Sequence, residues 1–110
     1  MHYKELLKAR DELTGSGGPF EITETDVLGN RIRIYKNAPL SVREVWLSTI
    51  EFSERPYLIY GDERLTYGEA HERVNAVASW LNAQGVKPGD RVAIAMRNYP
   101  EWMLIYWACV

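Results

Sequence analysis

The stretch that decides the fold runs from Leu65 to Val110 and reads LTYGEAHERVNAVASWLNAQGVKPGDRVAIAMRNYPEWMLIYWACV. It contains the signals of a helix, a short buried strand and a second helix, in that order. Thr66 and Glu69 have the spacing of a capping box, in which two side chains satisfy free backbone amides at the start of a helix. The sequence therefore predicts a helix that begins directly after Thr66.

The apolar residues of this helix recur at positions that share one face, which indicates a buried stripe. They are Ala70, Val74, Val77, Ala78 and Leu81. We expect the helix to end at Gly85, which can adopt the left-handed conformation that follows many helices. Val86 can then fold back onto Leu81, and Pro88 prevents the helix from continuing.

The next two elements are predicted from an apolar run and a proline. Arg91–Met96 is a short apolar segment between polar residues, which is typical of a strand buried on both faces. Pro100 suits the first turn of a helix expected over 101–110, whose residues are almost all apolar. Because no stop signal follows, we expect this helix to be buried in a larger domain of which the chain is the front part.

The residues before Ala38 predict a helix, a linker and a hairpin. Tyr3–Leu13 has the charged and apolar pattern of a short amphipathic helix, and the glycine-rich segment Gly15–Pro19 is interpreted as a linker. Phe20–Val27 and Arg31–Tyr35 are expected to form two strands, with Ile32 and Ile34 facing a core.

The residues from Ala38 to Leu65 predict a further helix and a second hairpin. Ser41 and Glu44 form another capping box, and the helix that follows should end near Ser53. Tyr57–Tyr60 and Glu63–Leu65 are expected to pair around a Gly61-Asp62 turn. The predicted fold class is therefore mixed α/β.

Three strings within this region resemble a known family: L-T-Y-G-E at 65–69, R-V-N-A-V-A-S-W-L at 73–81 and G-V-K-P-G-D-R-V-A-I-A-M-R-N-Y-P-E-W at 85–102. In order and spacing they are similar to the early part of the adenylate-forming, AMP-binding acid–CoA ligases of the acyl-CoA synthetase superfamily. The resemblance implies that 38–110 is the start of the large adenylation domain, with the start of a largely parallel sheet flanked by helices, truncated in a helix. The helix, linker and hairpin of 1–37 resemble the N-terminal extension of some bacterial fatty-acid or aryl-acid CoA ligases.

The family resemblance also implies an activity for the parent protein. Such enzymes use ATP, Mg²⁺ and coenzyme A to convert a carboxylic acid into its CoA thioester through an acyl-adenylate. Their phosphate loop with its Lys, their Tyr-Gly-x-Thr-Glu segment, their ribose-binding Asp and their catalytic Lys lie downstream of the similar region. We therefore assign no catalytic, cofactor-binding or metal-binding residue here, and expect the fragment alone to be structural and inactive. The N-terminal hairpin favours a fatty acid as substrate.

A second hypothesis treats the 110 residues as a self-contained α+β interaction module. It would bind a partner through its apolar C-terminal helix. The sequence downstream of Val110 distinguishes the two hypotheses, because by family resemblance a ligase requires a phosphate loop with a Lys there. In the ligase hypothesis the partner of the chain is the remainder of the adenylation domain.

Several individual residues have a functional and a structural interpretation, and the structural one is favoured for each. Gly15–Pro19 lacks the Lys and the strand-to-helix context of a phosphate loop. His71 has no second His or carboxylate at metal-ligand spacing. Cys109 lies in an apolar helix without a basic neighbour, which favours a small core residue. The four tryptophans are expected to pack in the core; they are Trp46, Trp80, Trp102 and Trp107.

The loop Arg97-Asn98-Tyr99 is the segment with the most functional interest. It follows the end of a strand expected in a parallel sheet, and open α/β sheets bind ligands beyond such ends. A structural role for Asn98, as the cap of the next helix or as part of a turn before Pro100, is the favoured alternative.

Composition excludes some classes of partner. Thirteen basic and fifteen acidic residues give a net charge of −2, without the basic stripe that a nucleic-acid partner requires. No segment has the roughly twenty apolar residues of a membrane span. A single Cys and the lack of a signal peptide predict a cytoplasmic protein. The apolar C-terminal helix predicts that the isolated chain forms a homo-oligomer.

Overall fold

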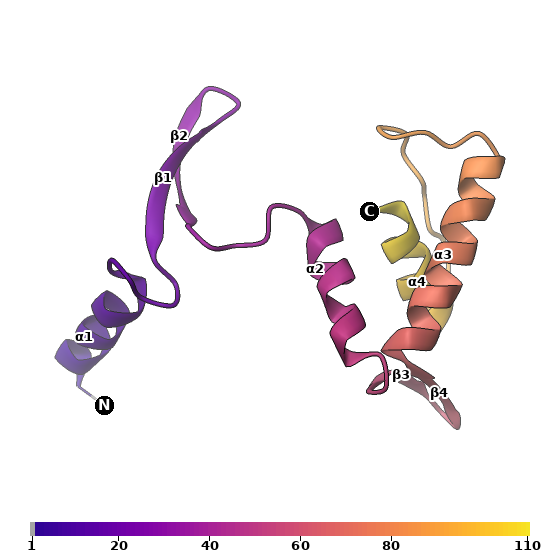
Figure 1. Cartoon of the computed structure of the whole chain (residues 1–110), viewed down its shortest axis with the longest axis horizontal. Coiled ribbons are helices and arrows are strands. Elements are labelled where there is room, and N and C mark those ends of the chain that lie inside the picture. The colour runs from indigo at the N-terminus through magenta and orange to yellow at the C-terminus, as the bar shows by residue number, and fades with distance from the viewer. Residues whose placement is uncertain (1) are drawn as a thin grey trace. The chain divides into compact units, whose positions relative to one another are not determined.

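The computed structural model describes residues 2–110 and divides into two compact units, one up to Leu40 and one from Ser41 to Val110. The first unit holds α1 (Tyr3–Thr14), β1 (Ile22–Val27) and β2 (Asn30–Tyr35). The second holds α2 (Val42–Ser48), the 3₁₀ turn η1 (Thr49–Phe52), β3 (Pro56–Tyr60), β4 (Glu63–Thr66), α3 (Tyr67–Ala83) and α4 (Pro100–Cys109) (Figure 1). The predicted mixed α/β class is confirmed by these helices and two small antiparallel hairpins.

The β1–β2 hairpin has the two-residue turn that suits twisted strands. Val27 pairs with Asn30, so Leu28 and Gly29 form the turn with φ values of 49° and 80°. Positive φ at both positions is the type I′ geometry that matches the right-handed twist of the strands. Ile32 and Ile34 share one face as predicted, but 42% and 37% of their surfaces stay exposed, because no described element of this unit buries them.

Helix α3 begins and ends as its sequence predicts. The Glu69 amide donates to Thr66 Oγ1 at 3.2 Å, and the Thr66 amide donates to Glu69 Oε2 at 2.8 Å. At the other end Gly85 has a φ of 90°, and the Val86 amide donates to the Leu81 carbonyl at 3.2 Å. Both the capping box and the left-handed glycine cap are therefore confirmed.

The core of the second unit lies where α2, β4, α3 and α4 meet. Its buried residues are Trp46, Leu65, Ala70, Val74 and Leu104. Figure 1 shows α3 and α4 side by side, and the two helices are in contact. Of the predicted α3 stripe, Ala70 and Val74 are buried, whereas Val77, Ala78 and Leu81 are half-buried. The α2 helix begins at the predicted cap, since Ser41 Oγ accepts from the Glu44 amide at 3.2 Å.

The strand predicted over Arg91–Met96 is not formed. In the described residues the sheets are the pairs β1–β2 and β3–β4, and neither includes this segment. A strand exists only where a neighbour completes its hydrogen-bond ladder, and no described segment does so here. Val92 and Met96 accordingly keep 37% and 41% of their surfaces exposed.

Within residues 2–110, the structure has no helix whose length and apolar character would let it cross a membrane. Helix α4 is the most apolar, yet it extends only from Pro100 to Cys109. Pro100 occupies its first turn as predicted, where the missing amide proton costs no hydrogen bond.

Candidate functional site

The loop 97–99 connects the extended segment 91–96 to α4. The Tyr99 amide donates to the Arg97 carbonyl at 2.7 Å, which places Asn98 at the centre of a tight three-residue turn. Tyr99, with φ −90° and ψ 159°, is the residue that directly precedes α4. Its side chain makes no capping hydrogen bond to the first turn of this helix. The turn interpretation of Asn98 is therefore confirmed, and its interpretation as the helix cap is wrong.

An open pocket of about 320 Å³ lies beside this loop, between β3 and the start of α4. Its wall is mostly apolar and aromatic and includes the Asn98 amide; it is formed by Leu58, Ile59, Tyr60, Asn98, Tyr99, Pro100, Trp102 and Met103. The rings of Tyr60 and Tyr99 meet edge to face at 5.7 Å between centroids. Small-molecule pockets typically combine apolar walls with few polar groups. This pocket can hold an apolar group but offers no charged side chain for catalysis.

A stack of three rings forms the centre of the second unit. Trp46 lies between His71, at 4.0 Å and 19°, and Trp107, at 4.9 Å and 16°. Aromatic pairs with offset stacking contribute beyond the area they bury. Across the core, Trp107 Nε1 donates to Tyr57 Oη at 2.6 Å. These contacts join α2, α3, α4 and β3, so Trp46 and Trp107 act in packing, as predicted.

His71 belongs to this packed core. Its side chain is 7% exposed, and Nε2 lies 3.0 Å from Thr49 Oγ1. The Thr49 hydroxyl donates its one proton to the Trp46 carbonyl at 2.7 Å, so we assign the proton of the imidazole to Nε2, which donates to Thr49. Burial lowers the pKa of His71. His71 therefore packs within the core, in keeping with the structural interpretation of this residue.

Two residues expected in the core are at the surface instead. Trp80 is 61% exposed, because it lies on the side of α3 that the core does not reach. Cys109 is exposed at the end of α4, since the contacts of that helix are concentrated around Leu104 and Trp107. Among residues 2–110, no three His, Cys, Asp or Glu side chains are grouped so that they could hold a metal ion.

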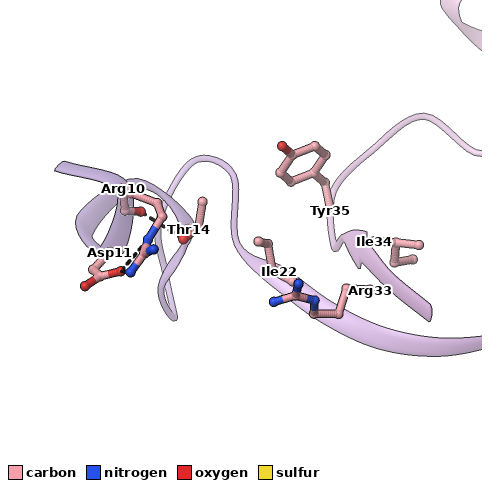
Figure 2. Close-up of a pocket in the computed structure, with 7 residues that line it drawn as sticks. All are labelled: Arg10, Asp11, Thr14, Ile22, Arg33, Ile34 and Tyr35. Atoms are coloured by element: carbon pink, nitrogen blue, oxygen red, sulfur yellow. Dashed lines mark hydrogen bonds and ion pairs between the residues drawn. The ribbon is translucent and has the colours of Figure 1, made fainter. Parts of the chain in front are cut away.

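Sequence reasoning missed a second hollow, in the first unit. It lies between α1 and the β1–β2 hairpin, and Arg33 and Tyr35 from β2 line it together with Arg10 of α1 (Figure 2). The alternation along β2 places Arg33 and Tyr35 on one face. Their proximity to α1 depends on how the chain turns after that helix, which periodicity does not indicate.

The family match lies within the second unit. Residues 48–110 match the AMP-binding family, described as AMP-binding enzymes. The chain is 42% identical over 59 residues to a medium/long-chain-fatty-acid–CoA ligase of Mycobacterium tuberculosis. It is 50% identical over 50 residues to acetyl-coenzyme A synthetase of Chlorobaculum tepidum, and 44% identical over 50 residues to feruloyl-CoA synthase of an Amycolatopsis species.

These matches are short relative to the proteins compared. They cover 54%, 44% and 46% of this chain, in the same order, but only 10%, 8% and 10% of the three relatives. No solved structure matches the chain significantly.

Proposed function

The chain belongs to the family of AMP-binding enzymes, and we propose that it is an early part of the adenylation domain of an AMP-forming acid–CoA ligase. In this reaction a carboxylate oxygen attacks the α-phosphorus of ATP, and the bond to pyrophosphate breaks. The thiol of coenzyme A then attacks the acyl-adenylate, and AMP leaves. The observation that carries the proposal is the family match over 48–110, together with the similarity of the chain to relatives named as CoA ligases and synthetases.

Within such an enzyme, the described residues act as a scaffold. The three relatives are named for different acyl groups, fatty, acetyl and feruloyl, yet each matches about half of this chain at 42–50% identity. A segment shared across different acids supports a common architecture rather than the choice of acid. The ring stack around Trp46 fits this role, because ring packing and the Trp107–Tyr57 hydrogen bond join four elements.

We further propose that the chain is inactive alone. Phosphoryl transfer relies on cations and hydrogen-bond donors fixed around the phosphates. The pocket beside Asn98 is lined without a charged side chain. ATP, Mg²⁺ and coenzyme A would therefore be bound by other parts of the enzyme. We also propose that the enzyme is cytoplasmic. Among acids we propose a medium- or long-chain fatty acid, because the N-terminal hairpin resembles the extension of some bacterial fatty-acid CoA ligases.

Pyrophosphate release tests these proposals. The purified 110-residue chain and the protein extended by the downstream reading frame are each mixed with ATP, Mg²⁺, coenzyme A and one of acetate, octanoate, palmitate or ferulate. We expect acid-dependent release from the extended protein, fastest with octanoate or palmitate, and none from the chain alone. Release by the chain alone would overturn the scaffold role. A reading frame without any acid-dependent release would favour the interaction module.

Self-association through α4 stays a prediction. Leu104 is buried in the structure, while Trp102, Ile105, Tyr106 and Trp107 are half-buried. A partly covered apolar helix favours association with another copy. Light scattering of the chain, alone and with Ile105→Glu, measures it: a monomer at high micromolar concentration, unchanged by the substitution, would contradict the prediction.

A further inference from the structure

The hollow in the first unit lies outside residues 48–110, so the family match assigns no role to it. It has a volume of about 740 Å³, within the range of small-molecule sites. Its two walls are tied together by the backbone, because the Phe20 amide donates to the Leu13 carbonyl at 3.0 Å. A side chain at Gly18 would collide with the Leu13 carbonyl, so the close return of the chain requires glycine there.

The hollow contains a guanidinium without an acidic partner. Arg10 Nε and Nη2 both donate to Asp11 Oδ1, at 2.8 and 2.5 Å. Arg33 faces Glu24 across the strands, but Glu24 Oε2 instead accepts from Arg31 Nε at 2.7 Å. Within residues 2–110, the Arg33 side chain therefore makes no hydrogen bond or ion pair.

Apolar surface lies next to this guanidinium. Ile22 and Tyr35 pair across the strands on the same face as Arg33. The ring of Phe20 packs edge-on against Tyr35 at 6.1 Å and restrains it. Figure 2 shows Arg33 extending from β2 toward α1 alongside Ile22. The Arg33 guanidinium, which can donate two parallel hydrogen bonds, therefore lies next to the apolar surface of Ile22 and Tyr35.

We propose that this hollow binds an amphiphilic carboxylate, with its two oxygens on the Arg33 guanidinium and its apolar body against Ile22 and Tyr35. Arginine and carboxylate form paired, charge-assisted hydrogen bonds. Arg10, Asp11 and Arg33 together contribute one net positive charge to the hollow, which matches the single negative charge of a carboxylate. The proposal is independent of the ligase reaction, because it requires neither ATP nor coenzyme A.

Titrations of the ¹⁵N-labelled 110-residue chain test the proposal. The probes are octanoate below its micelle-forming concentration, acetate, octanol and inorganic phosphate. We expect octanoate to shift the amides of Thr14, Arg33 and Tyr35 saturably. Acetate lacks the apolar body and octanol lacks the charge, so each should bind at least about tenfold more weakly. Phosphate should be weaker than octanoate as well.

Two substitutions separate the guanidinium from charge in general. Arg33→Gln should weaken octanoate binding by about tenfold or more, since it removes the paired, charge-assisted bonds. Arg33→Lys keeps the charge but cannot donate the paired hydrogen bonds, so its affinity for octanoate should lie between those of the unsubstituted chain and Arg33→Gln. Lys8→Gln is the matched control, because Lys8 is an exposed cation of α1 that does not line the hollow.

Octanoate shifts that survive Arg33→Gln, that are reproduced by octanol, or that fall in the second unit would overturn the proposal. An equal loss of binding in the Lys8→Gln variant would also overturn it, because attraction to net positive charge would then suffice. Arg33 has no partner in the described residues, so its replacement should leave the circular dichroism spectrum unchanged.

Discussion

Removing the Tyr57 hydroxyl measures how strongly the ring cluster of the second unit holds its elements together. Trp107 Nε1 donates to Tyr57 Oη at 2.6 Å, and the bond joins α4 to β3. Both side chains are half-buried, and burial raises the pKa of Tyr57, as expected for a hydroxyl partly withdrawn from water. Tyr57→Phe leaves the indole N–H in place without its acceptor.

The magnitude follows from that geometry. A buried donor left without a partner costs about 1–3 kcal/mol, and half-burial places Tyr57→Phe toward the lower end, at about 1–1.5 kcal/mol. Trp107→Phe removes the donor and also part of the stack on Trp46, whose centroid lies 4.9 Å away. Stacking contributes about 0.5–1.5 kcal/mol beyond area, so this variant should lose about 2–3 kcal/mol in total. The double variant should be less destabilised than the sum, by about 0.5–1.5 kcal/mol.

The assay is urea denaturation followed by far-ultraviolet circular dichroism, because a variant lacking a tryptophan changes the fluorescence signal itself. Tyr60→Phe is the control on the same strand: Tyr60 is 49% exposed, and its hydroxyl makes no hydrogen bond within the described residues. Its free energy of unfolding should change by less than about 0.5 kcal/mol. A coupling energy of zero between positions 57 and 107, or equal effects of Tyr57→Phe and Tyr60→Phe, would refute the reasoning.

Three further substitutions test local features. Gly85→Val should cost about 1–2 kcal/mol in urea denaturation, since Gly85 has a φ of 90°, and Gly85→Asn should cost less; an unchanged midpoint for Gly85→Val would contradict the cap. Leu28→Asn should stabilise the first hairpin by about 0.5–1 kcal/mol, because Leu28 has a φ of 49° in a turn that favours Asn-Gly; amide exchange of β1 and β2 measures it. Burial lowers the folded pKa of His71, so stability should fall as pH drops below about 6.5, where the unfolded state takes up the proton more readily. His71→Gln should reduce this dependence in urea midpoints compared between pH 7.5 and pH 5, and an unchanged slope would contradict it.

The element ends predicted most accurately are those with a local cause. The α3 caps involve residues three to five positions apart, and the structure contains both. The turn over 87–90 is held by contacts of the same local kind: the Asp90 amide donates to the Lys87 carbonyl at 3.0 Å, and the Lys87 amide donates to Asp90 Oδ2 at 2.8 Å. Such contacts form between neighbours in sequence, so residue type and spacing are enough to predict them.

Burial was predicted less well, because periodicity shows which residues share a face but not whether another element lies against it. Val74 and Trp80 are both apolar residues of α3, yet one is 3% exposed and the other 61%. The difference is made by Trp46 and Leu104, which come from α2 and α4 and pack on one side of α3. Cys109 shows the same limit at the end of α4.

The pairing of charges around the hollow of the first unit also depends on more than the register of the two strands. Glu24 lies directly opposite Arg33, and register alone would pair them. The structure instead pairs Glu24 with Arg31, a diagonal neighbour, at 2.7 Å. Strand twist brings one diagonal closer than the other. Arg33 is therefore left without an ion-pair partner among the described residues. This pairing follows from the three-dimensional geometry of the hairpin, and the alternation of side chains along a strand does not predict it.

The segment 91–96 shows the strongest form of this dependence. Its apolar composition suits a strand, but backbone hydrogen bonds in a sheet are made with another strand and never within one. A helix such as α3 satisfies its own backbone, so its pattern and caps predict it without reference to the rest of the fold. A buried strand has no such independence. Whether Arg91–Met96 forms a strand therefore depends on a neighbouring strand, which no other described residues provide, and its own residues indicate only that its composition suits one.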